Sequence, residues 1–173
     1  MASKYAGYMG KVIMVDLTTQ TVREYPWSDE QRELYLGGKI MAARILCDHL
    51  TGKETAFSEE NWVVISTGPL TGTGAPSSAR FNISALSPQT GILASSNCGG
   101  SFGFHLKKAG YDALILKGKC QDINGWRSMR SSSSFMMPVI SGAQRSANVK
   151  TSWPHWSARR SSASYVSDLP VKT

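Results

Sequence analysis

The sequence has few of the residues that build metal centres or active sites. Its 173 residues include three cysteines, Cys47, Cys98 and Cys120, which are far apart and form no CxxC pair. A cubane iron–sulfur cluster takes four thiolates and a zinc site takes closely spaced ligands, so these residues predict neither centre. The three histidines have no acidic residue at a useful spacing. We therefore predict reduced thiols and no catalytic acid or base.

Long apolar runs and a phosphate-binding P-loop are missing as well. No stretch approaches the roughly 18 apolar residues of a membrane-spanning helix, and the first ten residues lack the apolar core of a signal peptide. No Gly-Lys-Ser/Thr triplet ends the glycine-rich region, which argues against a nucleoside triphosphate site. We expect a soluble, cytoplasmic protein without a membrane partner.

Charge is distributed unevenly along the chain. Residues 1–120 carry 12 Lys/Arg and 10 Asp/Glu, whereas residues 121–173 carry 7 and 2. The net charge of +7 therefore comes mainly from the C-terminal tail. A non-enzymatic module whose basic tail binds nucleic acid or another anionic surface is one hypothesis, although the balanced first part makes nucleic acid the less favoured partner.

The tail also differs in composition from the rest of the chain. Of its 53 residues 13 are serine, none is glutamate and three are tryptophan, and it keeps no helical or strand periodicity. Aromatic residues are depleted in disordered linkers, so a simple linker explains the tail poorly. We predict a partial domain at residues 1–120 and an irregular, non-homologous tail at residues 121–173.

A shifted reading frame is the leading explanation of this tail. Suitable synonymous codons for residues 135–142, read after dropping two bases, give YDAGHLW, and the same offset over residues 165–173 gives CIGPAGEN. Both strings resemble stretches that follow in the family named below, in the same order. The hypothesis places a frameshift near residues 120–134.

The first 120 residues predict an α+β domain with mixed or antiparallel sheets. Short β-branched and apolar runs predict strands, and capped amphipathic runs predict helices. The strands are expected at residues 11–17, 21–25, 62–67, 80–86, 91–95 and 113–116, and the helices at residues 28–36, 39–50 and 101–109. In the second helix Ile40, Ala43, Leu46 and Leu50 recur at helical spacing, and Gly37-Gly38 separates it from the first.

Glycines and small hydroxyl residues are concentrated between residues 67 and 118. Ordering a glycine costs more conformational entropy than ordering another residue, so we expect this many glycines only where the backbone turns tightly or closely approaches a ligand. Gly72 and Thr73 belong to a turn-rich stretch, and Arg80 follows it as the one positive charge between Lys53 and Lys107. A guanidinium at that place suits a phosphate.

A second glycine-containing segment runs from Asn97 through Cys98, Gly99 and Gly100, between an expected strand and an expected helix. Backbone amides at such a junction attract anions, although an ordinary tight turn has the same pattern. Spacing alone leaves both interpretations open.

Two long stretches resemble a known family. The segments TGPLTGTGAPSSARFN and ASSNCGGSFGFHLKKAGYDALILKGK, preceded by GYMGKVIMVDLTTQTVREY and LGGKIMAARIL, resemble the N-terminal domain of the aldehyde ferredoxin oxidoreductases. The resemblance covers roughly the first two thirds of the chain. It implies a tungsten- or molybdenum-bis-pterin cofactor contacted by Arg80, and a magnesium and pterin-phosphate region contacted by Asn97 through its backbone carbonyl. It also makes cofactor contacts the favoured interpretation of Gly72, Thr73, Cys98, Gly99 and Gly100.

The resemblance further implies what a complete member would contain. Its 4Fe-4S cluster ligands and acid/base residues would come from later domains, its substrate would be an aldehyde, and its electrons would pass to a ferredoxin-like carrier. We expect this chain to be inactive alone. Pairing as a homodimer, or with a separate subunit that completes a split oxidoreductase, is a further alternative.

Overall fold

The computed structural model describes residues 3–119. Cys120, the tail at residues 121–173 and the frameshift hypothesis lie outside those residues. The elements follow the sequence predictions closely, with two differences reported below.

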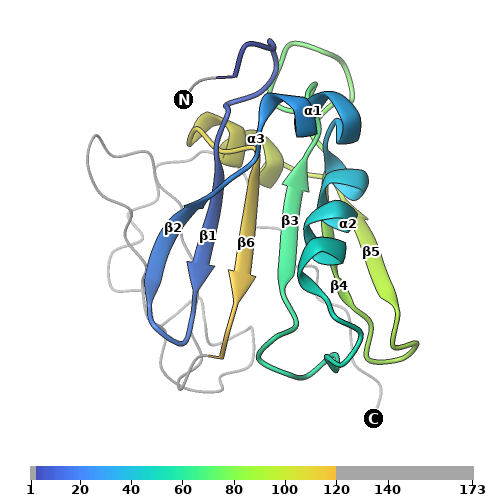
Figure 1. Ribbon diagram of the computed structural model, residues 1–173. Helices are drawn as coiled ribbons and strands as arrows, with labels where there is room; N and C mark the ends of the chain where they lie inside the picture. Colours follow the sequence, from blue (N-terminus) through green and yellow to red (C-terminus); the bar gives the residue numbers. More distant parts are fainter. Residues whose placement is uncertain (1–2, 120–173) are drawn as a thin grey trace, which may run out of the picture.

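Six strands form one mixed sheet in the order β2-β1-β6-β3-β4-β5 (Figure 1). The strands are β1 (Val12–Asp16), β2 (Thr21–Tyr25), β3 (Val63–Thr67), β4 (Phe81–Leu86), β5 (Leu93–Cys98) and β6 (Ala113–Lys117), and the helices are α1 (Asp29–Tyr35), α2 (Gly38–His49) and α3 (Phe102–Lys108). The pair β1 and β6 is parallel, whereas the other four neighbouring pairs are antiparallel. The predicted α+β class with a mixed sheet is confirmed.

The sheet carries an apolar core on each face. Met41, Ile45 and Leu46 of α2 pack on the face that includes Val12 and Val64. On the other face Leu106 of α3 packs with alternate residues of the same central strands, Ile13, Val15 and Leu114. Successive strand residues point to opposite faces, so the uninterrupted apolar runs of β1 and β6 supply both cores.

The first difference concerns the buried face of α2. The helical spacing of Ile40, Ala43, Leu46 and Leu50 matches that face only in part, because Ile40 is 56% exposed and the buried residues are Met41, Ala42, Ile45 and Leu46. The sequence contains two overlapping stripes at helical spacing that share Leu46. Contacts with the sheet, which the spacing does not report, select between them.

Close backbone approach explains the break between α1 and α2. Ser28 caps α1 in a capping box with Gln31, as its position at the helix start predicts. A Cβ at Gly37 would lie 2.5 Å from the carbonyl oxygen of Thr67 at the end of β3. Glycine at this position therefore lets the N-terminus of α2 lie directly against the loop after β3.

The second difference concerns β5, which runs from Leu93 to Cys98 instead of ending at residue 95. Its ladder with β4 pairs Asn97 with Asn82 and Cys98 with Phe81. Asparagine, serine and cysteine have weak strand preferences, so the pairing with β4 decides where this strand ends.

A buried ion pair fixes the N-terminal segment to the domain. Lys107 Nζ lies 2.6 Å from Asp112 Oδ1 and donates to the carbonyl oxygen of Gly7 at 2.7 Å. Asp112 also accepts from the backbone amides of Met9 and Gly10. Burial lowers the pKa of Lys107, and the nearby Asp112 carboxylate opposes that shift. Gly7 in turn packs against Pro69, so this network supports the loop that follows β3.

Candidate functional site

A hollow of about 390 Å³ opens where the end of β3, the start of β4 and the end of β5 meet the N-terminus of α2. Its lining includes Arg80 and Asn97, two residues that the sequence analysis proposed as cofactor contacts. They are 17 positions apart in the sequence, and the β4–β5 pairing brings their segments together. The loop at residues 68–80 forms another wall.

One side of the hollow is a polar extension of the sheet. Ser66, Asn82 and Asn97 occupy paired positions on β3, β4 and β5, so their side chains share the face that α2 covers further along. Asn82 is buried and its amide is held by Ser84 Oγ at 2.8 Å and by Ser95 Oγ at 2.5 Å. This network makes the wall rigid and leaves Asn97 exposed at its outer end.

Three sources of positive potential surround the hollow. Arg80 and Lys39 both line it with exposed side chains. In the part of the chain that the structure describes, no carboxylate lies within salt-bridge distance of either residue. The third source is the N-terminus of α2, where Gly37 provides no side-chain cap for the first backbone amides. The arrangement suits an anionic ligand.

The other predicted site residues lie around the hollow without lining it. Gly72 has a φ of +83°, and a Cβ there would meet Lys107 Cβ at 3.0 Å, so its conformation and its packing on α3 both require glycine. Thr73 Oγ1 donates to the carbonyl oxygen of Leu70 at 2.7 Å and stabilises the turn of the loop. Their contact with a cofactor stays a prediction.

The segment from Cys98 to Gly100 leads out of β5 towards α3. Cys98 is exposed and pairs with Phe81, on the sheet face opposite Asn97. Gly100 has a φ of +93°, which favours glycine. A Cβ at Gly99 would meet no atom within 4 Å. Neither contacts inside the described chain nor a left-handed conformation therefore account for glycine at position 99.

Sequence reasoning missed several residues of the hollow. Lys39 was predicted only as the first residue of a helix, and Ser66, Asn82, Ser77 and Ser78 received no role, although all of them line it. The position of Gly37-Gly38 directly before Lys39 is the signal that places a helix N-terminus here. Ser77 has a φ of 59°, a left-handed conformation that is uncommon for serine and gives the loop wall a fixed, strained shape.

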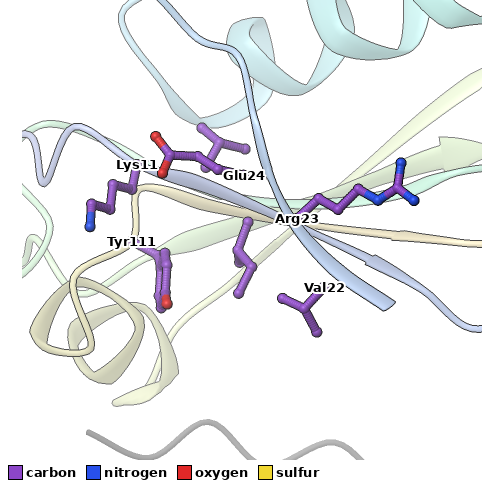
Figure 2. A pocket seen from close by; sticks show the side chains of 7 residues that line it. Lys11, Val22, Arg23, Glu24 and Tyr111 are labelled. Carbon is purple, nitrogen blue, oxygen red and sulfur yellow. The ribbon is translucent and has the colours of Figure 1, made fainter. Parts of the chain in front are cut away.

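A second, smaller hollow of about 200 Å³ lies between β1, β2 and Tyr111 (Figure 2). In the view of Figure 2, the side chains of Val22 and Tyr111 lie below the strands and Lys11 lies above Tyr111. It contains none of the predicted cofactor contacts. We therefore treat the first hollow as the candidate site.

Residues 3–119 offer neither a ready-made metal site nor a membrane-spanning helix. No group of three or more His, Cys, Asp or Glu side chains in that range is arranged to hold a metal ion. No helix within the same range is long and apolar enough to cross a membrane.

Comparison with known proteins gives consistent matches. The family described as aldehyde ferredoxin oxidoreductase, N-terminal domain, matches residues 12–124. The tungsten-containing aldehyde ferredoxin oxidoreductase of Pyrococcus abyssi is 42% identical over 113 residues, which are 65% of this chain and 19% of the relative. The WOR-like subunit of an aliphatic sulfonate oxidoreductase from Pyrococcus furiosus is 34% identical over 117 residues, or 66% of this chain and 18% of that subunit.

A solved structure agrees with these sequence matches. The active site complex BamBC of benzoyl coenzyme A reductase, bound to 1,5-dienoyl-CoA, has a TM-score of 0.67 and 37% identity. The match covers 69% of this chain and 18% of that one. The chain thus spans about a fifth of the length of its relatives. On the family match, the relatives and the shared fold, the chain belongs to the aldehyde ferredoxin oxidoreductase family and contains its N-terminal domain.

Proposed function

We propose that this chain is the cofactor-holding N-terminal part of an aldehyde ferredoxin oxidoreductase-like enzyme. The hollow beside Arg80 and Asn97 would hold part of a tungsten- or molybdenum-bis-pterin, together with magnesium. The bound cofactor would supply the two-electron chemistry by which an aldehyde becomes a carboxylic acid. The single observation that carries the proposal is that Arg80 and Asn97 line one hollow.

The chemistry of the residues present fits a phosphate-bearing group. Arg80 offers planar paired donors, Lys39 adds a point charge, and the first amides of α2 add backbone donors. Gly99 is a glycine that no contact in the described chain explains, as expected where a ligand approaches the backbone. These groups bind and orient. None of them is proposed to transfer a proton.

Each residue has a distinct proposed role. Arg80 pairs with anionic oxygen of the pterin and lies towards the place of the iron–sulfur cluster in a complete enzyme. Asn97 contributes its backbone carbonyl to magnesium, a hard cation that prefers oxygen ligands. Gly72, Thr73, Cys98, Gly99 and Gly100 complete the surrounding backbone.

The remaining domains of a complete enzyme would supply the 4Fe-4S ligands, the aldehyde pocket and the contact with a ferredoxin-like carrier. The chain alone is accordingly proposed to be inactive, with a tail produced by a frameshift.

Sequencing the gene from before codon 110 tests the origin of the tail. We expect a single shifted reading frame to encode both YDAGHLW and CIGPAGEN. If the tail's own reading frame is genuine and neither string is encoded, the result favours the binding module with a basic tail. Restored activity after addition of a complementing subunit would instead support a split oxidoreductase.

Retention of pterin tests cofactor binding directly. The full 173-residue chain is produced in a host that makes the bis-pterin cofactor, and oxidised pterin released from the purified protein is measured by fluorescence. We expect pterin to co-purify with the chain. Replacing Arg80 with alanine should weaken binding about tenfold or more, because a hydrogen bond to a charged group contributes about 1.5–3 kcal/mol.

The matched control is Arg23→Ala, since Arg23 is an exposed arginine on β2, away from the hollow. Its pterin content should equal that of the unchanged chain. A chain that retains no pterin, or equal losses in both variants, would contradict the proposal.

A further inference from the structure

Among residues 3–119, β5 is an edge strand of the sheet. It pairs with β4 on one side, and no other strand of the described chain pairs with it on the other (Figure 1). In an antiparallel ladder every second residue directs its N–H and C=O away from the partner strand. These groups form a template for one more strand.

The two edges of the sheet differ in protection. The β5 sequence LASSNC has no charged residue and no proline, and every residue after Leu93 is exposed. The opposite edge, β2, has the sequence TVREY and exposes Arg23 and Glu24. Edge charges oppose the approach of another strand, so β2 is protected and β5 is not.

The sequence of β5 is compatible with pairing to itself. A two-fold axis between two antiparallel copies places a central residue opposite its own copy, which for β5 is Ser95 or Ser96, depending on register. Serine hydroxyls that face each other across the axis can hydrogen-bond. If β2 paired with a second β2 in the same way, Arg23 would lie opposite Arg23 in one register and Glu24 opposite Glu24 in another, and like charges would repel. Residues 1–120 carry 12 basic and 10 acidic side chains, so this part of the chain contributes a net charge of only +2 to the repulsion between two copies.

We propose that β5 pairs antiparallel with β5 of a second copy of this chain, which joins the two sheets into one continuous sheet. Asn97 lies on β5 and lines the hollow, so the two hollows of such a dimer would lie close to its axis. Strand pairing alone buries less than the roughly 1,000 Å² of a stable interface. The dimer is therefore weak and depends on concentration.

Sedimentation equilibrium of the full chain tests the proposal. With rising concentration the mass should increase from 18.8 kDa towards twice that value. In Ser96→Lys, the two new ammonium groups lie on the same face of the joined sheet, either opposite each other or two positions apart, and the dissociation constant should rise at least tenfold. In Val22→Lys, a matched change at an exposed position on β2, it should stay the same.

A monomer across the whole range, or a dimer that Ser96→Lys leaves unchanged, would overturn the proposal. Circular dichroism shows whether both lysine variants are folded. If Ser96→Lys unfolds, Ser95→Cys and Ser96→Cys are tested for a disulfide-linked dimer in a background whose native cysteines are replaced by serine. One of the two should crosslink, and crosslinking by neither would refute pairing through β5.

Discussion

The half of the sheet built from β1, β6 and β3 contrasts with the half built from β4 and β5. In the first half, Val12, Val15, Leu114 and Ile115 are buried completely between helices or against other apolar residues. In the second half, β4 alternates apolar residues with buried polar ones, and most of β5 is exposed. The first half stabilises the domain, whereas the second presents polar groups at the hollow. A substitution in the first half should lower the free energy of unfolding, whereas a substitution at the hollow should weaken binding of the proposed cofactor.

Replacing Asp112 with alanine should give the largest effect in the first half. The change leaves Lys107 buried without its carboxylate and removes the acceptor of the Met9 and Gly10 amides. Loss of one partner from a buried pair costs about 3–5 kcal/mol of unfolding free energy. Urea denaturation measures the loss. A change below about 1 kcal/mol would show that the network does not support the fold.

A pair of substitutions separates the two halves most directly. Leu46→Ala removes a completely buried side chain from the α2 core and should cost about 2–5 kcal/mol. Ser96→Ala, on exposed β5, should change the unfolding free energy by about 0.5 kcal/mol or less. Both are compared by the urea midpoint at one low protein concentration. Similar costs for the two variants would remove the distinction between the halves.

Acid should weaken the attachment of the N-terminal segment to α1. Hydrogen bonds from Ser3 Oγ and the Lys4 amide lower the pKa of Asp29 from 3.8 to about 2, and Arg32 adds to the shift. Because the folded pKa is depressed, this contribution to stability is complete above about pH 4 and is lost as the pH falls towards 2. Asp29→Asn should flatten the pH dependence of the melting temperature in that window. An unchanged slope would contradict this role.

The smallest effect is expected from Asn97→Ala. The substitution keeps the backbone carbonyl that is proposed to contact magnesium, so pterin retention should fall less than it does for Arg80→Ala. Magnesium bound per pterin, measured by elemental analysis, should change little. A loss as large as that of Arg80→Ala would assign the contact to the side-chain amide.

The same contrast explains what could be predicted from the sequence. The strands β1 and β6 and the capping of α1 follow from local patterns, because apolar runs and a Ser28–Gln31 box carry their own signal. The buried face of α2 and the length of β5 could not be predicted, since both depend on partners distant in the sequence. Arg80 and Asn97 were found through the family resemblance, but Lys39 and Asn82 were not. Only the folded sheet brings these four residues together.

The parallel pairing of β1 with β6 also determines when the domain can fold during synthesis. Val12 pairs with Ala113, so the middle of the sheet needs a strand near each end of the described chain. Closing such a long loop costs entropy before its contacts form, which slows folding. The hairpin of β1 and β2 can form early, but β6 completes the sheet only after residue 117 has left the ribosome. Until then β1 and β3 each lack a neighbour, and a nascent chain stopped before that point exposes both strand edges to pairing with other chains.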